Sequence, residues 1–471
     1  MLARDATYDG RFLAGVVGTG IYCLPSCQAC KPKPEDVRFF TDPQAAQKKG
    51  LRACRRCRPD HFYRQYDPDQ DRVLQLVKEL RQAPENFRHA KDLAKSAGLG
   101  TSQLNQLFQR HFHNTPAALL TRARIPAAQR LLTETDRPLS QIACDVGFES
   151  LSSFNESFLR LSATQPTDYR SLPGAKRFEV RLPENWHRRR ILTYLGRDPQ
   201  SPVQQIQGDS LQMGVCLEGT PTLLRVDLGD SRATCDLVSK KALPETAAIA
   251  AQGIVLRILG LTIDPAPFER HVSRSPALAP LVEGRRGLRI PQTATFFEGL
   301  AWTILGQQIN LAFALTLFRR LVERAGQPVG EGLFAPPTPE AVAAIEISEL
   351  TAQQFSGRKA EYLIDTATLV AQGKLCLEDL AMGSATATEQ TLKAVRGIGP
   401  WSANYLMMRA FGFEDCLPLG DTGLTQGLWR FFNLEERPRG EVTEKLMRPF
   451  SPHRSLATFH LWQSLAKEVE P

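Results

Sequence analysis

The sequence lacks any uninterrupted apolar run long enough to cross a membrane, since a spanning helix needs about 20 such residues. Its first residues also lack the basic-then-apolar pattern of a secretory leader. These two absences argue against the membrane and secreted classes. We therefore expect a soluble cytoplasmic protein without a membrane partner.

The chain has no large excess of charge over most of its length. Residues 181–471 contain 31 Lys and Arg against 31 Asp and Glu, whereas residues 1–180 contain 27 against 19. The whole net charge of +8 therefore lies in the first 180 residues, which predicts a diffuse electrostatic footprint on nucleic acid there. The neutral remainder would have to bind DNA through local contacts. A chain of 471 residues is too long for a single hydrophobic core, which predicts three or four domains.

Cysteine is scarce outside one segment, because five of the ten lie before residue 58. In a cytosolic protein such clustering favours a metal or reactive thiols over disulfides. Cys23 and Cys27 form one close pair, and Cys54 and Cys57 form a second. Two such pairs can supply four thiolates to one tetrahedral Zn²⁺, which would provide much of the folding energy of a domain over residues 1–66. The alternative is four free cysteines in a small core.

The segments RDATYDGRF, TGIYCLPSC and CRRCRPD resemble the methylphosphotriester-repair domain of the Ada adaptive-response family. In that family a zinc-bound thiolate takes the methyl group from a methylated DNA phosphate and keeps it. The resemblance implies that Cys23 is the acceptor, whereas spacing alone does not choose among the four cysteines. Cys30 stands where the family usually has a basic residue, and it could compete as a ligand or as an acceptor.

Residues 68–172 are predicted to be all-helical, with two similar halves. Each half has a short helix, a turn at Gly98 or Gly147, and a second amphipathic helix over Thr101–Phe112 or Ser150–Leu161. This is the helix-turn-helix arrangement, in which the second helix enters the major groove of DNA. Together with a closing QPTDYR, the two halves resemble the AraC-type DNA-binding domain. The side chains expected to reach base edges are Gln103, Asn105, Gln106 and Gln109 on the first helix and Ser152, Ser153, Asn155 and Glu156 on the second. A helical bundle without a DNA role is the alternative.

The Pro- and Gly-containing stretch at 171–177 predicts a linker, after which the composition changes. Residues 177–285 contain alternating apolar stretches typical of strands, followed by a helix at 244–260. They resemble the small α/β domain that precedes the catalytic domain of AlkA-type 3-methyladenine DNA glycosylases. Residues 286–471 form the last predicted domain, which we expect to be helical throughout from Arg289 onward. The predicted fold class is thus multidomain α+β: a small zinc domain, an all-α tandem helix-turn-helix, a small α/β domain and an all-α domain.

The stretch from Leu392 to Leu424 organises that last domain. Gly397, Ile398 and Gly399 form a tight turn before Pro400, which begins the next helix well. Backbone N–H groups at such a helix N-terminus suit a phosphate oxygen, so the segment predicts a helix-hairpin-helix clamp on the DNA backbone. With Asp421 downstream, it resembles the helix-hairpin-helix-GPD superfamily of base-excision glycosylases. The resemblance implies that Asp421 stabilises an oxocarbenium-like sugar and positions water. A turn residue or helix N-cap is the alternative.

The same resemblance implies further site residues. Gln308, after the Ile304–Gln307 turn, would fill the gap left by a flipped nucleotide. The expected pocket walls are Tyr194, Trp401, Tyr405 and Trp462, whose faces attract cationic alkylated purines. Gln463 replaces an aromatic residue of well-known relatives, which could alter the range of lesions. Trp401 occupies the place of a Schiff-base lysine, so no β-lyase activity is expected. No cysteine follows Cys416, so no iron–sulfur cluster is expected.

These resemblances predict a fusion of an Ada-type sensor and transcription activator with an AlkA-type alkylbase glycosylase. Zn²⁺ is the expected cofactor. The expected partners are alkylated double-stranded DNA, promoter DNA and RNA polymerase. The Pro-Cys-His-Arg motif of the O6-alkylguanine methyltransferase half of some Ada proteins is absent. Two alternatives stay open: a repair glycosylase whose N-terminal half only binds DNA, and a zinc-thiol regulator that responds to oxidants.

Overall fold

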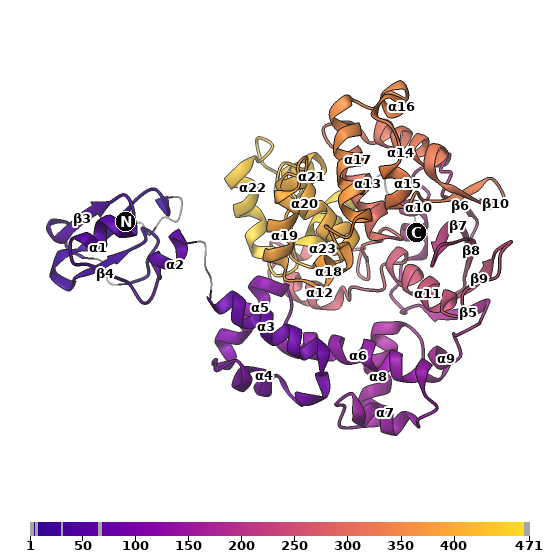
Figure 1. The fold of residues 1–471 in the computed structure, drawn as a ribbon, viewed down its shortest axis with the longest axis horizontal. Helices are drawn as coiled ribbons and strands as arrows, with labels where there is room; N and C mark the ends of the chain where they lie inside the picture. Colours follow the sequence, from indigo (N-terminus) through magenta and orange to yellow (C-terminus); the bar gives the residue numbers. More distant parts are fainter. Residues whose placement is uncertain (1–3, 5–7, 30–31, 65–67, 466–471) are drawn as a thin grey trace. The chain divides into compact units, whose positions relative to one another are not determined.

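The computed structural model describes residues 4, 8–29, 32–64 and 68–465. Cys30 therefore lies outside the described residues. The chain divides into two compact units, residues 1–77 and residues 78–471, and the division falls within α3 (Pro68–Gln82). Figure 1 draws the ribbon of both units, coloured along the sequence.

The smaller unit contains a four-stranded sheet in the order β3-β1-β2-β4. Its strands are β1 (Leu13–Val16), β2 (Ile21–Cys23), β3 (Val37–Phe40) and β4 (Arg52–Ala53), with helices α1 (Pro43–Lys48) and α2 (Pro59–Tyr63). The core around Leu13, Tyr22 and Leu24 is small. A core of this size supplies little stability by itself, which agrees with a unit that depends on a metal.

The larger unit begins with the two predicted helix-turn-helix halves. The first has α4 (Ala90–Ser96) and α5 (Thr101–Phe112), and the second has α7 (Leu139–Asp145) and α8 (Leu151–Ser162). The long helix α6 (Pro116–Glu134) connects them, and α9 (Pro166–Arg170) closes the second. Gly98 and Gly147 have φ values of 62° and 93°, which glycine adopts at no steric cost. Both predicted recognition helices are therefore present, the second shifted by one residue because Ser150 is its N-cap.

A five-stranded antiparallel sheet follows, in the order β5-β9-β8-β7-β6. Its strands are β5 (Arg177–Arg181), β6 (Gln204–Gln207), β7 (Ser210–Leu217), β8 (Thr220–Leu228) and β9 (Arg232–Val238), with α10 (Arg188–Leu195) between β5 and β6. Helix α11 (Ala247–Ile258) packs against β5 and β7 (Figure 1). This arrangement confirms the predicted strands and the helix that follows them.

The predicted linker is a packed connection. Leu172 is buried in a core that also contains Phe158 of α8 and Val180 of β5. The N–H of Gly174 donates to the carbonyl oxygen of Glu245 at 2.7 Å. The second helix-turn-helix half and the sheet thus share one hydrophobic core.

The rest of the larger unit is mainly helical and surrounds a second large core. Its helices are α12 (Ala266–Ser273), α13 (Phe296–Leu305), α14 (Leu311–Ala325), α15 (Pro339–Ala343), α16 (Ile347–Ala352), α17 (Gly357–Ala371), α18 (Leu377–Met382), α19 (Ala385–Ala394), α20 (Pro400–Leu406), the π-helical η6 (Met407–Phe411), α21 (Thr422–Phe431), α22 (Gly440–Met447) and α23 (Arg454–Gln463). The expectation of helix throughout was wrong, because β10 (Gln327–Gly330) and β11 (Leu333–Ala335) form a hairpin. This hairpin packs on β7 and β8, so contacts with the sheet stabilise it.

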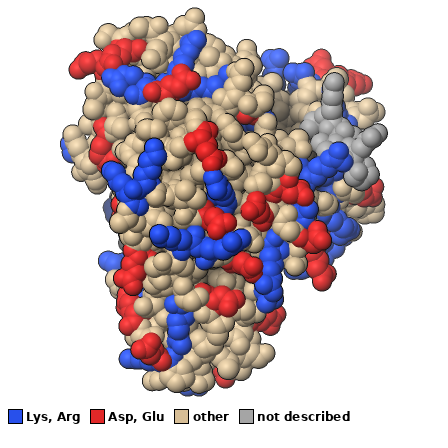
Figure 2. Space-filling view, turned by 90° about the vertical axis from the view of Figure 1, so that its right-hand side faces the viewer, with Lys and Arg blue, Asp and Glu red and all other residues tan. Residues whose placement is uncertain are grey.

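Among the described residues, no helix is both long and apolar enough to span a membrane. On the face drawn in Figure 2, Lys and Arg side chains are interspersed with Asp and Glu. A face of mixed sign offers DNA phosphates little long-range electrostatic attraction.

Candidate functional sites

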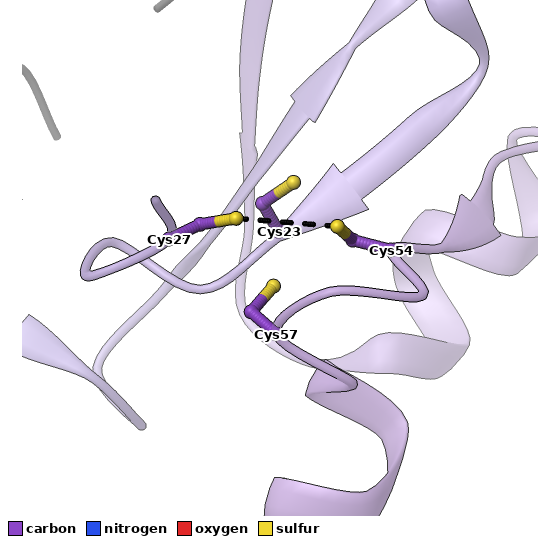
Figure 3. Close-up of side chains that lie close together, drawn as sticks. All are labelled: Cys23, Cys27, Cys54 and Cys57. Atoms are coloured by element: carbon purple, nitrogen blue, oxygen red, sulfur yellow. Dashed lines mark hydrogen bonds between the residues drawn. The ribbon is translucent and has the colours of Figure 1, made fainter. Parts of the chain in front are cut away.

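Four cysteine side chains converge in the smaller unit (Figure 3). Cys23 ends β2, Cys27 follows in the next turn, and Cys54 and Cys57 flank a turn between β4 and α2. Their Sγ atoms all lie within 4.8 Å of one another, and those of Cys27 and Cys54 are 3.9 Å apart. Ligands at about 2.3 Å from a tetrahedral Zn²⁺ would have sulfurs about 3.8 Å apart. The sulfur positions therefore fit a zinc ion.

The electrostatics of the cysteine cluster agree with this fit. A hydrogen bond with Cys23 lowers the pKa of the Cys57 thiol to about 6. The same hydrogen bond and burial raise the pKa of Cys23, and burial raises that of Cys27 to about 11. Several crowded sulfurs cannot all ionise without a neighbouring positive charge. A bound cation would supply that charge. The segment that carries Cys54 and Cys57 also contains three exposed basic residues, Arg52, Arg55 and Arg56.

Six of the eight predicted base-reading side chains are exposed on the surface of the larger unit. Those that are exposed are Gln103, Asn105 and Gln106 on α5 and Ser152, Ser153 and Glu156 on α8, whereas Gln109 and Asn155 are half-buried. The apolar side chains of the same helices, such as Leu104 and Phe154, are buried. Each helix thus presents an exposed polar face.

The hairpin between α19 and α20 is built around one apolar side chain. Ile398 is buried in the core, while Gly399 is exposed as the N-cap of α20. Gly397 has a φ of 90°, and a Cβ there would lie 2.4 Å from the ring of Tyr362. Glycine is therefore required at 397 on both conformational and steric grounds. The first N–H groups of α20 have no intrahelical acceptors and remain for an anion.

Asp421 is the N-cap of α21, as the alternative interpretation of this residue stated. Its Oδ1 accepts from the N–H of Leu424 at 2.7 Å and from Trp462 Nε1 at 2.9 Å. Its Oδ2 accepts from Trp401 Nε1 at 3.2 Å. Three donors suit an ionised carboxylate, which only accepts. Capping alone needs the first of these bonds, so the two indole contacts indicate an additional role.

The four predicted aromatic residues belong to one connected group. Trp401 stacks on Tyr405 with centroids 5.1 Å apart, and Tyr405 lies 6.0 Å from Trp462. Phe459 connects Trp462 to Tyr194 through contacts of 6.4 and 5.4 Å. Trp401 and Tyr405 line a cleft of about 1060 Å³, whereas Tyr194 and Trp462 are not among its lining residues.

The same cleft brings the other predicted groups together. Gln308 is exposed at its edge with a φ of 57°, and Asp421 and the hairpin glycines also line it. Gln307 donates from Nε2 to the carbonyl oxygen of Gly397 at 2.8 Å and to Ser402 Oγ at 2.9 Å. The turn that carries Gln308 is thereby connected to the hairpin.

Comparisons with known proteins agree with this geometry. Family models match for the metal-binding domain of Ada over residues 1–60, a helix-turn-helix domain over 93–171, and the HhH-GPD superfamily of base excision DNA repair proteins over 301–452. The Bacillus subtilis protein YfjP, whose name describes a DNA-3-methyladenine glycosylase, is 33% identical over 41% of this chain and 67% of its own. The chain belongs to the HhH-GPD superfamily of base-excision repair proteins.

Two further relatives extend the comparison of this HhH-GPD protein. A Mycobacterium tuberculosis protein, whose name describes a bifunctional transcriptional activator and DNA repair enzyme AlkA, is 28% identical over 99% of this chain and 95% of its own. A 3-methyladenine DNA-glycosylase structure from Archaeoglobus fulgidus matches 61% of this chain and 97% of its own at 20% identity, with a TM-score of 0.54, which shows a shared fold. The predicted family membership and fold class are confirmed.

Several residues around the cleft, which come from both the α/β domain and the HhH-GPD domain, were not identified from the sequence. The Nε1 of Trp302 donates to the hydroxyl of Tyr405 at 3.0 Å, and Arg197 lies over the rings of Tyr194 and Trp302 at 4.4 and 5.3 Å. Burial alone would raise the pKa of Tyr194, but Arg197 and Arg409 lower it. These residues come from distant segments, so no local pattern could have grouped them. Only Trp302 could have been found from the sequence, because it lies one turn before the Gly306–Gln307 motif.

Proposed function

We propose that residues 177–471 excise alkylated purines, of the 3-methyladenine class, from double-stranded DNA. The observation that carries this proposal is the carboxylate of Asp421, held by three donors at the edge of an aromatic-lined cleft. As the N-glycosidic bond lengthens, positive charge grows on the sugar, and the carboxylate stabilises it and orients the attacking water. The stacked Trp401 and Tyr405 attract a cationic base.

Access to the base requires the nucleotide to leave the stack. In this proposal the hairpin at 397–399 grips a backbone phosphate and Gln308 fills the vacated space. Both line the same cleft as Asp421. Trp401 cannot form an imine, so the product is an intact abasic site.

We further propose that Cys23 of residues 1–66 accepts a methyl group from a DNA methylphosphotriester. The Cys23 sulfur forms a bond to the methyl carbon, the carbon–oxygen bond breaks, and its electron pair leaves a phosphodiester anion. One bound Zn²⁺, held by Cys23, Cys27, Cys54 and Cys57, would keep sulfur deprotonated at neutral pH. The four-sulfur cluster and the match to the Ada metal-binding domain support this step.

Methylation gives the helix-turn-helix domain a means of regulation. Four thiolates on one Zn²⁺ carry about two negative charges, and methylation of one removes about one of them. Repulsion from DNA phosphates then falls, which favours promoter binding. Activation of transcription by contact with RNA polymerase, in the cytoplasm, completes the proposal.

One experiment with the full-length protein tests both activities. The protein is incubated with methylated duplex DNA, released bases are separated by chromatography, and cysteine peptides are mapped by mass spectrometry. Wild type should release 3-methyladenine and carry one methyl group on Cys23. Asp421→Asn should no longer release 3-methyladenine but should still gain the methyl group on Cys23. Cys23→Ser should release 3-methyladenine but gain no methyl group. Wild-type protein that neither releases base nor gains a methyl group would overturn the proposal.

A further inference from the structure

Lys359 has contacts that capping of its own helix does not explain. It lies in the first turn of α17, where Ser356 Oγ accepts its backbone N–H at 3.3 Å. A positive charge at a helix N-terminus opposes the helix dipole. Its ammonium forms no ion pair with any carboxylate among the described residues. The charge of Lys359 therefore destabilises α17, and contacts with other parts of the chain must offset this effect.

The ammonium group binds the end of another helix. Lys359 Nζ donates to the carbonyl oxygens of Leu305 and Gln307 at 2.7 Å each, and to that of Ile304 at 3.2 Å. These carbonyls end α13 and begin the turn that carries Gln308. The last carbonyls of a helix lack donor partners within the helix ladder, and a cationic side chain near the helix end can donate hydrogen bonds to them. All three donors of the ammonium are thus directed at one turn.

That turn contains an unfavourable backbone conformation. Gln308 has a φ of 57°, in the left-handed region that residues with a Cβ seldom adopt. Such a conformation persists when its surroundings hold it. Lys359 binds the carbonyl just before Gln308, and the side chain of Gln307 is held by Gly397 and Ser402.

The same helix also supports the hairpin. Tyr362, one turn after Lys359, lies under Gly397, where its ring leaves no room for a Cβ. Arg396 of the hairpin lies over this ring at 5.4 Å and pairs with Glu361 at 2.9 Å. The first two turns of α17 therefore hold both the Gln308 turn and the hairpin.

We propose that Lys359 is a positioning residue that holds Gln308 in the conformation needed to fill the flipped-out space, and so controls the flipping step. This inference rests on the proposed glycosylase function. It assigns to Lys359 no contact with DNA and no chemical step. Its loss should lower flipping and excision together, while the hairpin still binds intact duplex.

The test compares full-length Lys359→Met with Gln308→Ala and with their double variant. Flipping is followed with 2-aminopurine placed opposite a tetrahydrofuran abasic-site analogue, and excision by single-turnover base release from methylated DNA. Loss of hydrogen bonds from a charged group should slow base release by about tenfold or more. Lys359→Arg, which keeps charge and donors, should recover part of the rate. Lys374→Met, which removes an exposed charge beyond the end of α17, should leave both readouts unchanged.

The double variant decides between positioning and a general effect. If Lys359 acts through Gln308, the double variant is no slower than the slower single variant. Equal slowing by Lys359→Met in the presence and absence of Gln308 would overturn the proposal, as would an unchanged 2-aminopurine signal. Should Lys359→Met fail to fold, Lys359→Gln takes its place in the cycle. Wild-type protein without base release would instead contradict the glycosylase function.

Discussion

The indole N–H of Trp462 donates to Oδ1 of Asp421 at 2.9 Å, across 41 residues of sequence. Gly423 permits this contact, because a Cβ there would lie 2.8 Å from the Trp462 ring. We therefore expect Trp462 to orient the carboxylate, while its predicted role as a pocket wall stays a prediction.

Trp462→Phe should therefore lower the rate of base release more than the affinity for lesion DNA. The ring contacts survive in phenylalanine, but the hydrogen bond to Asp421 is lost. A hydrogen bond to a charged group contributes about 1.5–3 kcal/mol, so kcat should fall about tenfold to a hundredfold. Single-turnover rates and Kd for a lesion duplex measure the two effects separately. A raised Kd with an unchanged rate would return Trp462 to the role of a pocket wall.

The two hairpin glycines should respond differently to alanine. At Gly397 the φ of 90° and the Tyr362 ring both oppose a Cβ, so Gly397→Ala should lower the free energy of unfolding by more than about 2 kcal/mol. At Gly399 a Cβ would meet nothing within 4 Å, so Gly399→Ala should change stability little. Denaturant titration of both variants measures this. Equal stability of the two would contradict the packing of α17 under the hairpin.

Much of the site was predictable because its signals are local. The recognition helix at Thr101–Phe112, the hairpin at 397–399 and the four cysteines depend on periodicity, glycine and spacing, which act within a few residues. The long-range contacts were not predictable. Lys359 reaches three carbonyls more than 50 residues away, and nothing in its neighbourhood distinguishes it from a surface lysine.

The same distinction explains the errors in the fold. The β10–β11 hairpin is short, contains Pro328, and is stabilised by packing on β7 and β8 rather than by alternation. The stretch at 171–177 has the composition of a linker, yet Leu172 enters a core shared with β5. Composition indicates where a linker is possible, whereas the burial of side chains in that segment decides whether it is a linker or a packed connection.

We expect no lyase activity, and a trapping assay can test this expectation. Trp401 lines the cleft beside Asp421, and Lys359 is occupied with the carbonyls of α13. Borohydride added during reaction with lesion DNA should therefore give no protein–DNA adduct. Lys393, which also lines the cleft and lies 3.5 Å from Glu389, is the residue to test if an adduct forms. An adduct that disappears in Lys393→Met would show an imine and contradict the monofunctional mechanism.

The helix-turn-helix domain and the glycosylase domain should unfold together. Arg122 of α6 pairs with the carboxylate of Glu414 at 2.8 Å, where the Glu414 side chain is only 12% exposed. Burial raises the pKa of Glu414, and Arg122 opposes this effect. Arg122→Met removes the cationic partner of a buried carboxylate that keeps a long hydrogen bond from Asn114 Nδ2 at 3.5 Å. The free energy of unfolding should therefore fall by about 1–3 kcal/mol. Arg122→Met combined with Glu414→Gln should recover most of that loss in a denaturant titration. Separate melting of two parts of wild-type residues 78–471 would contradict this coupling.

Acid should destabilise the larger unit through its buried histidines. Burial lowers the pKa of His113 and His453 to about 4 and that of His460 to about 3, against about 6.5 in the unfolded chain. Between these values the unfolded state binds more protons, so stability is present above about pH 6.5 and is lost as pH falls toward 4. Each unit of pKa difference corresponds to about 1.4 kcal/mol.

Tryptophan fluorescence isolates this effect, because all five tryptophans lie beyond residue 77. Denaturant titrations between pH 7.5 and 4.5 should show a falling free energy of unfolding in wild type. His460→Phe removes the most strongly shifted histidine, which is fully buried and contacts the carbonyl of Leu281. The free energy of unfolding of the His460→Phe variant can be lower than that of wild type. Its change between pH 7.5 and 4.5 should nevertheless be smaller. The same slope in both proteins would show that carboxylates, rather than His460, cause the loss of stability in acid.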